Sequence, residues 1–225
     1  MSDINRLYVM DVTCFEDEEL FKACYDQMSD PRKKKIDAYK PNASKRLSLG
    51  AGILLDRGLS EAGVSGYELE LGDQNKPFLK DRSDIFFNIS HSGNMAAVAI
   101  SDRAVGVDIE EHRHFDDGLI DYVFNESDKK TALELEALYK DKDIAYTALW
   151  TVKESIMKHS GMGVSLEPKK IYLSPAFFND SLNISAYTSS YDCTELHFSL
   201  FSIPCYNLTV CSEYEDFPSP VKVVL

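Results

Sequence analysis

The chain has 225 residues, 44% of them hydrophobic and 27% charged, as in an ordinary globular protein of one large domain or two small ones. Its net charge of −13 at pH 7 argues against nucleic acid or an anionic membrane as a partner, because either would require a basic face. No apolar run is long enough to cross a bilayer, no signal peptide is evident, and the five cysteines include no C-x-x-C pair, so we expect a protein of the reducing cytoplasm.

The first hundred residues predict helices followed by strands. After a strand over 6–12, apolar periodicity predicts helices over 17–28, 29–39 and 43–59. Short strands are predicted at 67–71 and 78–80. The apolar runs 85–89 and 95–100 then predict a hairpin whose polar tip is Ser90 to Asn94.

The second half repeats this mixture of helices and strands. A strand over 105–110 precedes predicted helices over 119–124, 127–139 and 141–160. Short strands are predicted at 171–173, 182–187, 195–203, 206–212 and 221–224. Each half therefore offers helices together with strands, which predicts an α+β fold, although no residue-level repeat is evident.

Cations gather in the first eighty residues, although the chain as a whole is acidic. They are the run Arg32-Lys33-Lys34-Lys35 and the residues Lys40, Lys45, Arg46 and Lys76. A basic cluster kept by an acidic protein suits a small polyanion. The alternative is a solvated helix face.

The helix predicted over 141–160 places Trp150, Glu154 and Lys158 one turn apart on one face. Gly161 and Gly163 end it, as glycines do after helices. The plain interpretation is a core Trp and a surface Glu–Lys pair, which stabilises a helix only slightly.

Two acidic residues alternate with apolar ones in the strand over 105–110. Strand periodicity places Asp108 and Glu110 on one face. The alternative to a functional role is a solvent-facing strand edge. Carboxylate oxygens suit Mg²⁺, which takes a few protein ligands and fills its octahedron with waters and phosphates. Glu154 is the candidate third ligand.

The predicted hairpin tip is a further candidate site. Ser90 and Ser92 flank His91, and Gly93 gives access to the backbone, so the tip could bind a phosphate. These are also ordinary turn residues, and alone they indicate little.

Three motifs in order carry a family resemblance. They are Phe87-Asn88-Ile-Ser90-His91-Ser92, Gly106-Val-Asp108-Ile-Glu110 and Trp150-x-x-Lys153-Glu154-x-x-x-Lys158. Together with Lys76-Pro77 and the segment after Gly161, this pattern resembles the 4′-phosphopantetheinyl transferase superfamily. The total length is similar to that of the Sfp-type branch. Asn75 stands where that family commonly has Gly before Lys-Pro, and Asn tolerates left-handed backbone geometry.

The resemblance implies a monomer built as a pseudo-two-fold pair of similar α/β subdomains, here 1–104 and 105–225. It implies transfer of 4′-phosphopantetheine from coenzyme A to a serine of an acyl or peptidyl carrier protein, with Mg²⁺ as cofactor. The implied metal ligands are Asp108, Glu110 and Glu154, and the implied catalytic residues are Glu154, Lys158 and Asp108. The implied coenzyme A contacts are Arg46, Lys76, Ser90, His91, Lys34 and Lys158, although the motif does not decide which cation of Arg32 to Lys35 makes the contact.

Other interpretations stay open at this point. The chain could be a magnesium-dependent phosphotransferase or phosphatase acting on another diphosphate, or a coenzyme A-binding module without chemistry. We interpret Trp150 and Lys153 as structural. For carrier docking we expect the segment 111–126 with Phe115, Leu119 and Phe124 as anchors, the alternative being a surface helix with an ordinary buried face.

Overall fold

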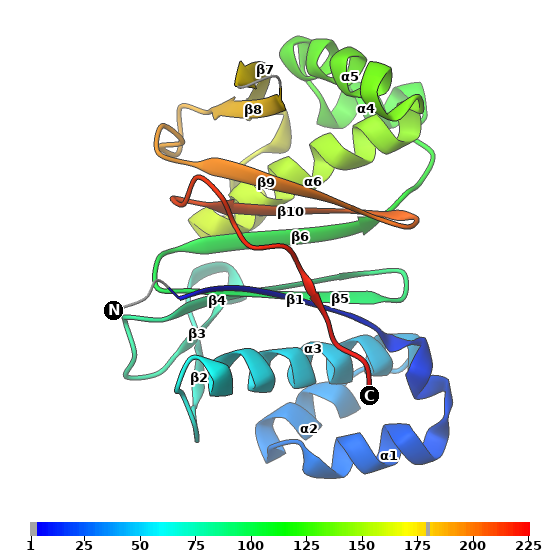
Figure 1. Ribbon diagram of the computed structural model, residues 1–225, viewed down its shortest axis with the longest axis vertical. Coiled ribbons are helices and arrows are strands. Elements are labelled where there is room, and N and C mark those ends of the chain that lie inside the picture. Colours follow the sequence, from blue (N-terminus) through cyan, green and yellow to red (C-terminus); the bar gives the residue numbers. More distant parts are fainter. Residues whose placement is uncertain (1–3, 179–180) are drawn as a thin grey trace.

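The computed structural model of the chain describes residues 4–178 and 181–225. Helices, a four-stranded sheet, a three-stranded sheet and further helices follow one another from bottom to top in Figure 1. This mixture confirms the α+β prediction. No helix in the described ranges is long and apolar enough to span a membrane. Residues 1–3, part of the segment in which no signal peptide is evident, lie outside the described residues.

The lower sheet has the strand order β11–β1–β5–β4. Its strands are β1 (Asn5–Asp11), β4 (Phe86–Ser92), β5 (Met95–Ser101) and β11 (Val221–Lys222). Helix α3 (Asn42–Glu61) lies on its outer face, and α1 (Glu18–Gln27) and α2 (Asp30–Asp37) pack beyond α3 (Figure 1). A separate pair is formed by β2 (Leu69–Leu71) and β3 (Pro77–Leu79).

The upper sheet has the strand order β6–β10–β9. Its strands are β6 (Val105–Glu111), β9 (His197–Ile203) and β10 (Tyr206–Ser212). Helix α6 (Lys142–Ser160) lies on its outer face, with α4 (Asp117–Val123) and α5 (Glu126–Tyr139) above (Figure 1). Strands β7 (Tyr172–Phe178) and β8 (Ser181–Tyr187) form another separate pair.

The C-terminal segment returns from the upper sheet to the lower one, where β11 pairs in parallel with β1. In Figure 1 this red segment crosses in front of both sheets. The division at residue 104 stays a prediction, and the last strand packs with the N-terminal sheet.

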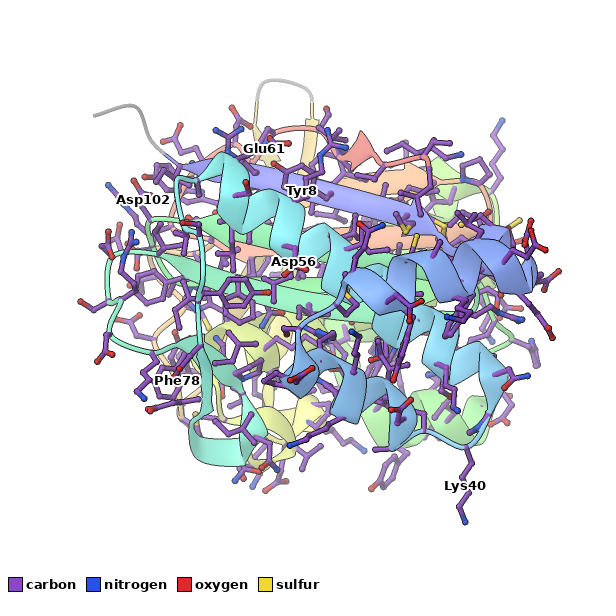
Figure 2. The ribbon with its side chains drawn as sticks, turned by 90° about the horizontal axis from the view of Figure 1, so that it is seen from below. Tyr8, Lys40, Asp56, Glu61, Phe78 and Asp102 are labelled. Carbon is purple, nitrogen blue, oxygen red and sulfur yellow. The ribbon has the colours of Figure 1, made fainter. Side chains whose placement is uncertain are left out.

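The layers follow from alternation along the strands. In β1, Tyr8 and Met10 pack in the cluster that includes α3, whereas Leu7 and Val9 face the upper sheet. The Tyr8 hydroxyl donates to Glu61 at the end of α3 at 2.8 Å, and Figure 2 shows both residues from the α3 side. The two sheets therefore share one apolar interface, and each keeps a second apolar face for its helices.

The hairpin between β4 and β5 differs from the prediction. The strands continue to Ser92 and resume at Met95, so only Gly93 and Asn94 make the turn. Gly93 has a φ of +55°, which glycine adopts at no steric cost. The prediction of a polar tip from residue 90 onward was wrong because polar residues at alternate strand positions were interpreted as turn residues.

A fully buried ion pair joins α6 to α5. Lys153 Nζ lies 2.6 Å from Asp128 Oδ2, and neither side chain is exposed. Lys153 also donates to the backbone carbonyls of Pro168 and Ile171. The prediction that Lys153 is structural is confirmed, whereas Trp150 lies partly buried at the edge of the core rather than within it.

We expect Lys153→Met to lower the free energy of unfolding by about 3–5 kcal/mol, because Asp128 would remain buried without its cation. Adding Asp128→Asn should restore much of this loss, since no charge then remains buried. Urea unfolding measures both variants. Lys22→Met is the control, because it breaks an exposed pair with Asp26 and should cost less than about 1 kcal/mol. Equal losses in Lys153→Met and the control would contradict the expectation.

Candidate active site

Three polar side chains of β4 cover the open edge of β6. The acceptors Asn88 Oδ1, Ser90 Oγ and Ser92 Oγ receive the backbone N–H groups of Val107, Ile109 and Glu111 at 3.0, 3.2 and 3.1 Å. Strand β6 is the outer strand of its sheet, so these donors would otherwise lack a partner strand. We call Asn88, Ser90 and Ser92 the edge seam. It holds β6 beside β4.

Helix α6 lies directly against β6 at Gly106. A Cβ at this position would stand 2.0 Å from the carbonyl oxygen of Ser155 and 2.6 Å from the backbone nitrogen of His159. Only glycine permits so close an approach. The glycine of the Gly-Val-Asp motif therefore lets α6 pack closely against β6.

The predicted limits of α6 and the common face of Trp150, Glu154 and Lys158 agree with the structure. Asp141 caps its N-terminus through two backbone N–H groups, and Gly161 ends it with a φ of +72°. From residue 145 to residue 160 the helix is buried except at Trp150, Glu154, Lys158 and Ser160. The predicted face is thus the side of α6 that remains accessible.

Asp108 is the centre of the cluster and is 2% exposed. Its Oδ1 accepts hydrogen bonds from Ser90 Oγ at 2.8 Å and from Lys158 Nζ at 2.6 Å. Its Oδ2 is buried and has no hydrogen-bond partner among the described residues. Burial raises the pKa of Asp108 to about 6, with Lys158 opposing the shift and Glu110 adding to it. Asp108 is therefore no solvent-facing edge residue.

Glu154 and Glu110 complete the acidic cluster. Burial, followed by the charges of Asp108 and Glu110, raises the pKa of Glu154 to about 7, while Lys158 and Arg113 oppose the shift. Glu110 accepts a hydrogen bond from Ser92 Oγ at 2.7 Å.

Three neighbouring carboxylates and a partnerless buried oxygen are chemically suited to a hard cation. Nevertheless, no three His, Cys, Asp or Glu side chains within residues 4–178 and 181–225 form a group arranged to hold a metal ion. Lys158 supplies the positive charge at Asp108 Oδ1 in this structure. The assignment of Asp108, Glu110 and Glu154 as metal ligands stays a prediction.

His91 leaves β4 on the side opposite the edge seam. Although the residue is exposed at the surface, desolvation of its ring lowers its pKa, and the cations Lys158 and Lys35 lower it further. Lys35 is thus the cation of α2 near His91. The Lys34 and Lys35 side chains are both exposed, and neither makes a hydrogen bond or ion pair within the described part of the chain. The effect of the Lys35 charge on His91 therefore favours Lys35 over Lys34 as a ligand contact.

Arg46 lies near the start of α3. Its Nη2 is 3.4 Å from Glu16 Oε1, and its Nε is buried without a hydrogen-bond partner among the described residues. With Asn42 and Lys45 it lines a cavity of about 340 Å³. The cations of the first eighty residues are not one cluster, since Lys40 extends into solvent at one edge (Figure 2).

Lys76 has partners that the sequence did not indicate. Its Nζ donates to the backbone carbonyl oxygens of Lys158 at 2.6 Å and of His159 at 3.0 Å. Burial lowers its pKa. A cavity of about 270 Å³ lies beside it, and Glu154 and Lys158 contribute to its wall.

The expected docking anchors are wrong. Phe115 and Phe124 are fully buried and pack with Tyr146 in the core of the upper half, and Leu119 is partly buried against the same cluster. They provide the ordinary buried face of a surface helix, which was the alternative interpretation.

The sequence analysis missed the roles of Asn88 and Ser92 in the edge seam and the presence of Arg113 near Glu154. Polar residues at alternate positions of a strand-like run, 88, 90 and 92, were the available signal for the edge seam. No local pattern indicates Arg113.

Comparison with known proteins gives a family match. The sequence model of the 4′-phosphopantetheinyl transferase superfamily matches residues 104–211. The chain is 28% identical over 156 residues to the 4′-phosphopantetheinyl transferase Sfp of Bacillus subtilis (strain 168), covering 68% of this chain and 66% of that protein. It is 36% identical over 129 residues to the 4′-phosphopantetheinyl transferase AcpT of Salmonella typhi, covering 55% and 64%. The matched regions thus span just under two thirds of these relatives.

Among solved structures, holo-[acyl-carrier-protein] synthase of Thermotoga maritima is 17% identical, with a TM-score of 0.37 over 48% of this chain and 61% of that chain. A similarity at this level carries no argument about function.

His159 is a buried imidazole next to Lys158. It is 6% exposed, and its Nδ1 lies 2.8 Å from the Tyr191 hydroxyl. Burial lowers its pKa to about 4, and the Lys76 charge contributes. Its ring is therefore neutral in the folded protein at neutral pH.

We expect His159 to make the protein lose stability on acidification. Between pH 6.5 and 4 the unfolded chain binds a proton at His159 and the folded protein does not, so its contribution is intact above pH 6.5 and is lost as pH falls through this window. The loss should reach about 3 kcal/mol. Urea unfolding at a series of pH values should therefore give a steeper curve for the native protein than for His159→Gln.

His114→Gln is the control for this comparison, since the His114 side chain is 78% exposed. Parallel curves for the native protein and His159→Gln would contradict the expectation.

Proposed function

Because the chain belongs to the 4′-phosphopantetheinyl transferase superfamily, we propose that it transfers 4′-phosphopantetheine from coenzyme A to a serine of an acyl or peptidyl carrier protein. The observation that carries the proposal is the acidic cluster around Asp108, with its partnerless buried oxygen and the Lys158 ammonium beside it. A diphosphate substrate needs this combination, because charge develops on its phosphoryl oxygens during transfer.

In the proposed reaction the serine oxygen attacks the β-phosphorus of coenzyme A. The bond from that phosphorus to the bridging oxygen breaks, and adenosine 3′,5′-bisphosphate leaves. The serine proton passes to a base, for which we propose Glu154. Glu154 lies on the accessible side of α6 and contributes to the wall of the cavity beside Lys76, which supports this role.

Asp108, Glu110 and Glu154 are the residues we propose as ligands of Mg²⁺. When bound, the ion supplies charge neutralisation at the pyrophosphate. Lys158 would add positive charge at the same place, because its ammonium already lies between Asp108 and Ser90. Ser90 is buried and its hydroxyl is engaged by neighbouring groups, which supports orientation of Asp108 and Lys158 as its role.

For the remaining phosphate groups of coenzyme A we propose His91, Arg46 and Lys35, with Lys34 as the less favoured neighbour. Their positive charge or hydrogen-bond donors would act mainly by positioning the nucleotide. The partly unpaired guanidinium of Arg46 supports this assignment.

We further propose a cytoplasmic monomer. The five cysteines are all free thiols, which supports a reducing compartment.

Intact mass spectrometry tests the activity. Incubation of an apo carrier protein with this protein, coenzyme A and Mg²⁺ should add one phosphopantetheine per carrier, and EDTA should prevent the gain. Asp108→Asn should reduce the rate by about a hundredfold or more, because it removes a charge from the proposed metal site. Glu134→Gln, an exposed acid on α5, is the matched control and should retain the native rate. No gain with carriers from fatty acid, polyketide and peptide synthesis would contradict the proposal.

A further inference from the structure

Lys76 lies in the N-terminal part of the chain and reaches the C-terminal end of α6. It follows a tight turn in which Gln74 and Asn75 both have left-handed φ values, +54° and +60°. The turn closes through hydrogen bonds from Gly72 N to the Lys76 carbonyl at 2.9 Å and from Asn75 N to the Gly72 carbonyl at 3.1 Å. The backbone at Lys76 is therefore held in place, and its ammonium is directed to the C-terminus of α6.

The last carbonyl groups of a helix have no partner in the helical backbone and need other donors. At the end of α6, the Met157 carbonyl accepts from the Ser160 hydroxyl at 3.0 Å. The next two carbonyls, of Lys158 and His159, both accept from Lys76 Nζ. Within the described residues, Lys76 thus provides the side-chain donors for two of the terminal carbonyls. A positive charge at this end of a helix is also electrostatically favourable.

Lys158 is held by its backbone, and its side chain lies in the proposed active site. The Lys158 carbonyl accepts a hydrogen bond from Lys76. The Lys158 ammonium lies 2.6 Å from Asp108 Oδ1 and 2.8 Å from Ser90 Oγ. Loss of the cap would free the turn that carries Lys158. The ammonium would then lose its fixed distance from Asp108.

We propose that Lys76 is a positioning residue, which caps α6 and fixes Lys158, rather than a phosphate contact. The cap itself follows from the hydrogen bonds, and its effect on turnover rests on the proposed transferase function. The two roles of Lys76 make different kinetic predictions. A phosphate contact raises KM for coenzyme A when it is removed, whereas a positioning residue mainly affects kcat.

Lys76→Met removes the donors and keeps much of the side-chain volume. We expect kcat to fall about ten- to a hundredfold while KM for coenzyme A changes less than about twofold. Amide hydrogen exchange should become faster in the last turn of α6 and remain unchanged in its first turns. Lys76→Arg, which can donate to the same carbonyls, should restore most of kcat and of the protection.

Lys80→Met is the matched control, because Lys80 follows β3 closely and its ammonium pairs with exposed Glu68. It should change neither kcat nor exchange in α6. A raised KM with unchanged kcat and unchanged exchange in Lys76→Met would overturn the proposal.

If Lys76→Met does not fold, Lys76→Arg carries the test. Native exchange at the end of α6 together with native kcat and an unchanged KM for coenzyme A supports the positioning role, whereas a raised KM at native exchange and native kcat overturns it. If the native protein transfers no phosphopantetheine, the proposed function fails, and hydrogen exchange still decides whether Lys76 caps the helix.

Discussion

The hydroxyl group of Ser90 is the point on which the architecture and the site both depend. It donates to Asp108, accepts the backbone N–H of Ile109 and accepts from the Lys158 ammonium. One oxygen therefore joins β4, β6 and α6. Asn88 and Ser92 make similar contacts along β4. They accept hydrogen bonds from backbone N–H groups at the edge of β6, in place of a neighbouring strand. The two sheets meet where the acidic residues lie, so their packing and the geometry of the site are set together.

The acidic cluster is costly for the fold. Burial and mutual repulsion raise the pKa values of Asp108 and Glu154, which means that the folded protein disfavours their charged forms. Lys158 and Ser90 offset part of this cost at one oxygen of Asp108, and the other oxygen has no partner among the described residues. Unfavourable burial of charged groups is expected at a site that binds a charged ligand, because preorganised groups do not have to reorganise during the reaction.

Local signals predicted the parts of the site that depend on local structure. The end of α6 followed from Gly161, and the common face of Asp108 and Glu110 followed from strand alternation. Contacts between distant segments could not be predicted in this way. Lys76 lies 82 residues from Lys158, whose carbonyl it holds, and nothing in its neighbourhood indicates that partner. Phe115 and Phe124 looked like exposed anchors because burial depends on packing against α6, which the sequence of the segment alone does not encode.

We propose that the edge seam and α6 assemble a cation site at Asp108. The most direct test of this proposal is to titrate Mn²⁺, as a stand-in for Mg²⁺, into the protein with coenzyme A. The electron paramagnetic resonance signal of the free ion measures how much Mn²⁺ is bound. We predict one bound ion per chain and an affinity at least about tenfold lower in Asp108→Asn, because a charged oxygen ligand is lost. Equal affinity in the two proteins, or no binding to the native chain, would contradict the claim.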